Sequence, residues 1–217
     1  ILSGDVMAFL SYRYLLECKS ERLPEVLGLF TKTAIEVCEG QQFDMNFEMR
    51  DDVTAKDYIE MIRLKTAVLL ACSLQLGAFE SGASEKDAQL IYEFGEKIGI
   101  AFQIRDDLFD YGTDDVGKPL GIDIKEKKMT LPLIFALNNA TRSDKRRIIN
   151  IVKKHNEIPE KVNEVIEFVR GSGGFEYAEK AMLKYRTDAF IILHSFPSSP
   201  TRESLEDLVN FSTDRKK

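Results

Sequence analysis

The stretch FQIRDDLFD, residues 102–110, decides the fold expected for this chain. At about 100° per residue around a helix, Gln103 and three carboxylates occupy one arc roughly 100° wide. The carboxylates are those of Asp106, Asp107 and Asp110. The apolar side chains of the stretch fall on the opposite side. It therefore predicts an amphipathic helix whose polar face carries three negative charges within little more than one turn.

The rest of the sequence indicates further helices. Glycine (13) and proline (6) are few among 217 residues, and the chain lacks the alternation typical of strands. Thr54 and Ser84 each precede an acid by three residues, which is a helix-start signal. We expect one all-α domain over residues 1–217, an antiparallel helical bundle. The predicted helices span about residues 1–18, 24–46, 54–80, 84–111, 130–141, 143–155, 159–171, 174–195 and 201–213.

Composition excludes several classes of protein. The 36 acidic and 30 basic residues leave a net charge of −6, which disfavours nucleic-acid binding through a general basic field. No uninterrupted apolar run approaches the ~20 residues of a membrane span, and the first residues do not resemble a signal peptide. The 3 cysteines and 2 histidines are widely spaced, which argues against a disulfide scaffold or a zinc site. We expect a cytoplasmic protein without a membrane span.

The three clustered carboxylates point to a divalent cation. Like charges four residues apart destabilise a helix by ~0.2–0.5 kcal/mol per pair, and a bound cation would reverse that effect. Mg²⁺ prefers to bridge one or two carboxylates to the phosphates of a substrate. We therefore expect Asp106, Asp107 and Asp110 to bind Mg²⁺. The alternative is a solvated acidic face on a helical scaffold that needs no metal.

Cationic residues elsewhere in the chain fit a diphosphate held on that metal. A lysine-rich loop follows the acidic helix, and its Lys118 and Lys128 could close over the phosphate oxygens. Upstream, Lys65 and Thr66 lie among apolar residues and offer an ammonium and a hydroxyl group. The alternatives are a solvated charge run for the loop and a lysine that extends to solvent for Lys65.

Several motifs in the same order resemble those of the trans-prenyl diphosphate synthases, of the bacterial medium- and long-chain type. The resemblance covers the whole chain and begins after that family's first aspartate-rich motif. One departure is Lys127, which stands where the family usually has glycine. The matching segments are Gly4-Asp5, Glu39-Gly40-Gln41, Lys65-Thr66, residues 99–111 with the second D-D-x-x-D motif, Gly117-Lys118, Asp123, Lys128 and Thr130-Leu131-Pro132.

The resemblance implies the isoprenoid synthase fold and a Mg²⁺-dependent condensation of isopentenyl diphosphate with an allylic diphosphate to a longer trans-polyprenyl diphosphate. It also implies a homodimer. By that resemblance, metal binding falls to Asp106, Asp107 and Asp110, which with Lys65 are the expected catalytic residues. Diphosphate binding falls to Lys65, Lys118 and Lys128, while Thr66 and Gln103 stabilise the cation or the diphosphate through their dipoles.

The helical pattern is already present at Ile1, and the first aspartate-rich motif of the family would precede it. We therefore expect an N-terminally truncated chain that is inactive alone, the C-terminal portion of the full fold. A second hypothesis is a non-catalytic subunit or helical partner of a heteromeric prenyl synthase. Product length depends partly on residues ahead of the first motif, so no length is predicted.

Overall fold

The computed structural model describes residues 1–17, 20–112 and 120–214, and these residues form helices and no strand. The all-α prediction is confirmed. The helices are α1 (Leu2–Glu17), α2 (Leu23–Phe47), α3 (Ala55–Ile62), the π-helical segment η1 (Arg63–Ala67), α4 (Val68–Glu80), α5 (Glu85–Leu108), α6 (Ile122–Lys125), α7 (Leu131–Asn138), α8 (Arg142–Lys154), α9 (Pro159–Gly171), α10 (Gly174–Leu193) and α11 (Pro200–Asp214).

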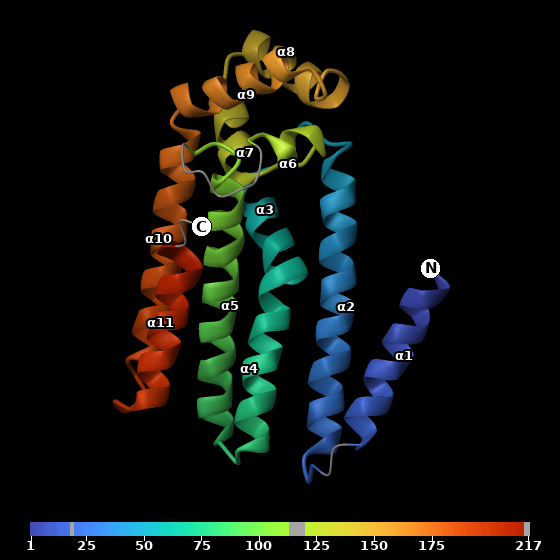
Figure 1. Ribbon diagram of the computed structural model, residues 1–217, viewed down its shortest axis with the longest axis vertical. Helices are drawn as coiled ribbons and strands as arrows, with labels where there is room; N and C mark the ends of the chain where they lie inside the picture. The colour runs from blue at the N-terminus through green and yellow to red at the C-terminus, as the bar shows by residue number, and fades with distance from the viewer. Residues whose placement is uncertain (18–19, 113–119, 215–217) are drawn as a thin grey trace.

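The long helices lie side by side as a bundle (Figure 1). Helix α5 packs against α4 on one side and against α10 and α11 on the other, while α2 packs against η1 and α4. The short helices α6 to α9 gather at one end of the bundle, and α1 leans away from α2 at the N-terminal side. The predicted helices agree with these elements to within a few residues. The main differences are the ends of α5 and α7, each three residues earlier than predicted, the π-helical interruption and the small helix α6.

Local sequence sets the helix starts as expected. The Thr54 hydroxyl accepts the backbone N–H of Asp57 at 3.1 Å, and the Asp57 carboxylate accepts the N–H of Thr54 at 3.0 Å. Ser84 caps α5 by accepting the N–H of Asp87 at 3.1 Å. Each cap satisfies amide groups that the first helical turn would otherwise leave without a partner.

Helices α3, η1 and α4 form one continuous helix, Ala55–Glu80. By length and composition it could cross a membrane, although 39% of its most apolar 18-residue window is buried inside the chain. Arg63 and Lys65 interrupt the apolar residues of this helix, so it contains no uninterrupted apolar run of that length. Ala67 and Ala71 are fully buried, so part of the apolar character belongs to the core of the bundle.

Glycines let α5 approach this helix closely. A Cβ on Gly99 would lie 2.6 Å from the Ala67 Cα, and a Cβ on Gly95 would lie 2.7 Å from the Ala71 Cα. Because both contacts are with backbone atoms, the two helices could not keep this spacing with larger residues. The paired small residues, four apart on each helix, hold the two axes close together.

A third glycine holds the π-helical segment from the other side. A Cβ on Gly40 of α2 would lie 2.4 Å from the backbone nitrogen of Lys65. The segment is thus enclosed between Gly40 and Gly99. π-Helical turns are rare and occur often at functional sites. The two glycines make room for the wider turn that carries Lys65 and Thr66.

Two alanine substitutions on α2 should have opposite effects on stability. Gly40→Ala forces a methyl group into the Lys65 backbone and should lower the free energy of unfolding by about 1–3 kcal/mol. Gly28→Ala is the matched control, because its Cβ would meet nothing within 4 Å. Removing a glycine from an open helical position should raise the free energy by roughly 0.5–1 kcal/mol. Urea unfolding followed by circular dichroism measures both, and an equal response would contradict the proposed close contact.

Candidate active site

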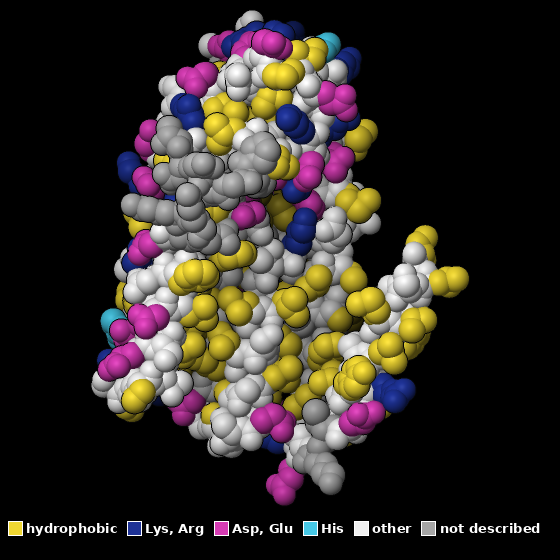
Figure 2. Space-filling view, viewed as in Figure 1, with side chains coloured by type: hydrophobic (Ala, Val, Ile, Leu, Met, Phe, Trp, Pro, Cys, Tyr) yellow, Lys and Arg dark blue, Asp and Glu magenta, His cyan; other side chains and the backbone are white. Residues whose placement is uncertain are grey.

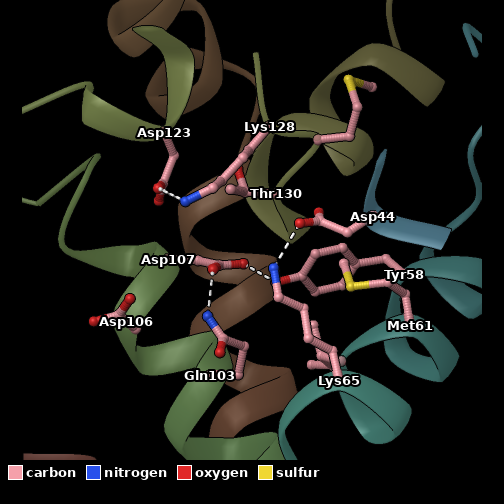
Figure 3. A pocket seen from close by; sticks show the side chains of 12 residues that line it. Asp44, Tyr58, Met61, Lys65, Gln103, Asp106, Asp107, Asp123, Lys128 and Thr130 are labelled. Atoms are coloured by element: carbon pink, nitrogen blue, oxygen red, sulfur yellow. Dashed lines mark hydrogen bonds and ion pairs between the residues drawn. The ribbon is translucent and has the colours of Figure 1, made fainter. Parts of the chain in front are cut away.

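A polar pocket lies between α2, α3, η1 and α5 and the residues just before α7 (Figure 3). It takes in about 390 Å³, including space open to solvent. Carboxylates and lysines face each other across it, an arrangement suited to a ligand that carries both anionic groups and a metal ion. The residues that line it are Asp44, Tyr58, Met61, Ile62, Lys65, Gln103, Asp106, Asp107, Asp123, Lys128, Met129 and Thr130.

The π-helical segment directs both residues of the predicted Lys65-Thr66 pair toward this region. The Lys65 Nζ lies 2.6 Å from Asp44 Oδ2, so α2 holds the ammonium group at the pocket (Figure 3). The Thr66 hydroxyl donates to Gln103 Oε1 of α5 at 3.0 Å. The structure therefore brings together three of the residues that the sequence singled out: Lys65, Thr66 and Gln103.

Asp107 is buried, with 3% of its surface exposed. Its carboxylate accepts the Tyr58 hydroxyl, Gln103 Nε2 at 3.4 Å and the backbone N–H of Leu131 at 3.4 Å. Burial raises the pKa of Asp107 to about 7, and the nearby charge of Asp123 adds to the rise. The hydrogen bonds from Tyr58 and Gln103 act in the opposite direction because they favour the charged carboxylate.

The other two predicted carboxylates lie in different surroundings. Asp106 lines the pocket and is partly exposed, and Figure 3 shows it pointing in a different direction from Asp107. Asp110 is buried and accepts the backbone N–H of Asp123. The α-helical part of α5 ends at Leu108, and the chain continues through Tyr111 with i→i+3 hydrogen bonds, a tighter turn that rotates Asp110 away from its α-helical position. Over the ranges that the structure describes, no group of three or more His, Cys, Asp or Glu side chains could hold a metal ion.

The available donors nevertheless fit Mg²⁺ in one mode. Asp106 is a partly exposed carboxylate that lines the pocket, whereas Asp107 is buried. Mg²⁺ commonly binds one or two carboxylates and takes its other ligands from water and phosphate oxygens. Asp106 would hold the ion directly, with Asp107 behind it. The assignment of Asp106, Asp107 and Asp110 as metal ligands stays a prediction.

Lys128 supplies a second cation at the pocket. Its Nζ lies 3.2 Å from Asp123 Oδ1 and 2.6 Å from Glu126 Oε2. Partial burial lowers the pKa of Lys128, but the two carboxylates outweigh this and raise the pKa above its ordinary value. The side chain therefore stays cationic at physiological pH. Lys118, the other lysine expected to bind diphosphate, lies outside the described residues.

An apolar groove adjoins the polar pocket. It runs along α4, α5 and α11 and takes in about 900 Å³, including space open to solvent. Figure 2 shows hydrophobic side chains gathered along this part of the bundle. Thr66, which lines the groove, is joined to Gln103, which lines the pocket, so this hydrogen bond marks the boundary between the two. The groove is lined by Thr66, Leu69, Leu70, Ser73, Ile98, Gly99, Phe102, Leu208, Phe211 and Ser212.

Sequence reasoning assigned no role at the site to Asp44 or Tyr58. Tyr58 precedes Lys65 by seven residues, which corresponds to two helical turns, and that spacing could have placed it on the same side. Asp44 lies 21 residues from Lys65 on another helix, so only the packing of α2 against η1 reveals the pair.

The chain is similar to known proteins along its whole length. The polyprenyl synthetase family model matches residues 1–169. A short chain isoprenyl diphosphate synthase of Methanothermobacter thermautotrophicus is 37% identical over 219 residues, covering 100% of this chain and 67% of that protein. Component 2 of the heptaprenyl diphosphate synthase of Bacillus subtilis is 30% identical over 195 residues, covering 89% of this chain and 55% of that protein.

Solved structures share the architecture. The geranylgeranyl pyrophosphate synthetase from Pyrococcus horikoshii superimposes with a TM-score of 0.92 at 32% identity, covering 99% of this chain and 66% of that one. The chain thus spans about two thirds of the length of the first curated relatives it matches. The relatives include short-chain and heptaprenyl synthases alike, so the expected medium- or long-chain type stays a prediction.

The raised pKa of Asp107 predicts a pH dependence of stability. The folded state holds this proton more tightly than the unfolded state, whose carboxyl titrates near pH 4. The resulting stability is therefore fully present below about pH 4 and is lost as pH rises toward 7. Asp107→Asn removes this decline, since its amide carries no charge at any pH. Urea midpoints in buffer containing a chelator, from pH 4.5 to pH 8, measure the slope.

Asp106→Asn is the neighbouring control for that series, and the wild-type slope should persist in it because Asp107 stays in place and buried. An unchanged slope in Asp107→Asn would show that this carboxyl titrates at its ordinary pKa. The absolute stability of Asp107→Asn does not decide the question, because the amide also changes the hydrogen bonds with Tyr58 and Leu131.

The backbone conformation at Lys127, in the loop that carries Lys128, gives a further prediction about stability. Its φ of 59° lies in the left-handed region, which explains why the family usually has glycine there. That conformation costs a residue with a side chain about 1–2 kcal/mol. Lys127→Gly should therefore raise the free energy of unfolding by roughly 0.5–1 kcal/mol after the added freedom of the unfolded chain is subtracted. Lys125→Gly, within helix α6, should lower it when both are measured by urea unfolding.

Proposed function

Because this chain belongs to the polyprenyl synthetase family, we propose that it takes part in the condensation of isopentenyl diphosphate with an allylic prenyl diphosphate. The observation that carries the proposal is the junction of a lysine- and carboxylate-lined pocket with an apolar groove at the Thr66–Gln103 hydrogen bond. A prenyl diphosphate has the same two parts, a polyanionic head and an apolar tail. The pocket suits the head and the groove suits the tail.

In the proposed reaction, the allylic carbon–oxygen bond breaks and the diphosphate departs with the bonding electrons. Lys65 and Lys128 hold the departing anion, and Lys118 would join them. The double bond of isopentenyl diphosphate then attacks the allylic cation, a carbon–carbon bond forms, and loss of a proton completes the longer prenyl diphosphate. The main barrier is charge separation, so fixed cations at the leaving group favour the reaction. Mg²⁺, when bound at Asp106, would neutralise further charge on the diphosphate.

Thr66 and Gln103 lie where the reacting carbon would sit, between the head and the tail. Their dipoles can stabilise a positive charge at this position. Asp107 lines the pocket but is held by protein donors, so its proposed part is to orient these groups. Asp110 supports the segment that leads to Lys128 by accepting the N–H of Asp123.

The predicted homodimer belongs to the same proposal. The sequence analysis considered the apolar helices 54–80 and 84–111 for the interface, but much of their apolar surface is buried within the chain. Large exposed apolar side chains lie instead on α1 and α2, including Val6, Phe9 and Phe43. A second copy of the chain would cover such a surface. The alternative of a heteromeric synthase stays a prediction, although one relative is named as a component of such an enzyme.

Thermal unfolding with Mg²⁺ and inorganic pyrophosphate tests the proposed head group. At about 100 times the dissociation constant, binding adds roughly 2.7 kcal/mol. For a chain of this size that corresponds to a rise in Tm of about 5–10 °C. The rise should require both components together and should be largely absent in Asp106→Asn.

Asp52→Asn is the matched control, since Asp52 is exposed and pairs with Arg50, outside the residues that line the pocket. It should keep the full rise in Tm. A wild-type chain that gains nothing from Mg²⁺ and pyrophosphate would contradict the proposed site, as would an equal rise in Asp106→Asn.

A further inference from the structure

Four polar side chains form a continuous line of hydrogen bonds from α3 to the edge of the apolar groove. Tyr58 donates to Asp107, Gln103 Nε2 lies 3.4 Å from Asp107 Oδ1, and Thr66 donates to Gln103 Oε1 at 3.0 Å. Tyr58 and Asp107 are almost fully buried, with 2% and 3% of their surfaces exposed. Figure 3 shows Tyr58, Asp107 and Gln103 converging on the pocket.

The chemistry of these groups gives the line a single direction. Asp107 accepts Gln103 Nε2 at Oδ1 and both the Tyr58 hydroxyl and the Leu131 N–H at Oδ2, so Tyr58 and Gln103 are donors to this side chain. The opposite orientation of the Gln103 amide would place its carbonyl oxygen against the carboxylate, and two acceptors would repel each other. With the amide NH₂ directed to Asp107, the Gln103 carbonyl faces Thr66. The hydroxyl of Thr66 therefore donates its one proton to Gln103.

This direction determines what Thr66 offers to a ligand. A hydroxyl has one proton and two lone pairs, and here the proton is used within the protein. Thr66 lines the apolar groove and its hydroxyl is bonded to Gln103, which lines the pocket, so the oxygen lies at the boundary between the two, with lone pairs that the bond to Gln103 does not use. Such an oxygen favours an electron-poor or cationic carbon and disfavours an anion.

Tyr58 is the member that keeps the Asp107 carboxylate in place. The other two donors to Asp107, Gln103 and the Leu131 N–H, are both at 3.4 Å, a long distance for a hydrogen bond. Without the phenol group, the buried carboxylate would turn toward another donor, because a buried charge that lacks hydrogen bonds is costly. The Gln103 amide would then lose the acceptor that sets its orientation.

We infer that Tyr58 is a positioning residue, which fixes the direction of the Asp107–Gln103–Thr66 line and thereby turns the Thr66 oxygen toward a cationic carbon at the mouth of the apolar groove. The identity of that carbon, the allylic cation, rests on the proposed function. The direction of the hydrogen bonds does not rest on the proposed function, because it follows from the side chains of the chain itself.

Tyr58→Phe tests this inference by removing one hydroxyl group at nearly constant volume. The direct readout is the side-chain amide of Gln103 in ¹H–¹⁵N spectra of the full chain. Its signals should move, and its protons should exchange with solvent roughly tenfold faster, the effect of losing about 1.4 kcal/mol of hydrogen bonding. In a prenyl transfer assay on a chain that also carries the first aspartate-rich motif expected ahead of Ile1, the variant should lose roughly tenfold in kcat with KM for the diphosphates unchanged, since the lost contact acts on the transition state.

Tyr111→Phe is the matched control. Tyr111 is equally buried, but its hydroxyl pairs with Thr130 at 2.9 Å. It should leave the Gln103 signals and kcat near their wild-type values. Unmoved Gln103 signals in Tyr58→Phe, or equal movement in Tyr111→Phe, would overturn the inference.

A measurement on the wild-type chain covers the case in which Tyr58→Phe does not fold. The Thr66 hydroxyl proton should exchange slowly enough to be observed, because it is donated to Gln103. Rapid exchange of that proton would overturn the direction of the line. Failure of Mg²⁺ and pyrophosphate to bind the wild-type chain would instead reject the proposed function and leave the hydrogen-bond result standing.

Discussion

The hydrogen bonds around one buried carboxylate connect most parts of this molecule. Asp107 lies on α5 and accepts donors from α3, from its own helix and from the first residue of α7. A buried polar group is costly unless it is hydrogen-bonded, so these three elements cannot separate without leaving the carboxyl group of Asp107 short of hydrogen bonds. The same constraint holds Gln103 in one orientation, and through it Thr66. A stability requirement and the geometry of the pocket therefore depend on the same atoms.

Close packing around Gly40 and Gly99 holds the π-helical segment in place, in addition to the hydrogen bonds that begin at Asp107. The π-helical turn moves Lys65 toward Asp44 while Thr66 reaches Gln103, and it is wider than an α-helical turn. Gly40 and Gly99 have no Cβ that would collide with this turn, so α2 and α5 can pack against it despite its extra width. The unusual backbone is stabilised by tertiary packing, because no strong local preference of residues 63–67 for a π-helix is evident in the sequence.

The sequence predicted most of the helices because caps such as Thr54 and Ser84 and the apolar periodicity are local signals. It also selected Lys65, Gln103 and Lys128, all of which line the pocket. It could not predict that α5 stops before Asp110, since the amphipathic pattern continues past the helix end. Nor could it pair Asp44 with Lys65, because that contact depends on how two helices pack.

At the centre of the molecule, residues next to each other in the sequence face different surroundings, one polar and one apolar. Lys65 lines the polar pocket while Thr66 lines the apolar groove, and Gln103 lines the pocket while Phe102 lines the groove. One step along a helix turns the next side chain by about 100°, enough to move it from one surrounding to the other. η1 and α5 meet where each changes from a residue that lines the pocket to one that lines the groove, and the Thr66–Gln103 hydrogen bond joins the two helices there. A ligand with a charged head and an apolar tail would place the junction of its two parts at that bond, beside the Thr66 hydroxyl and the Gln103 carbonyl.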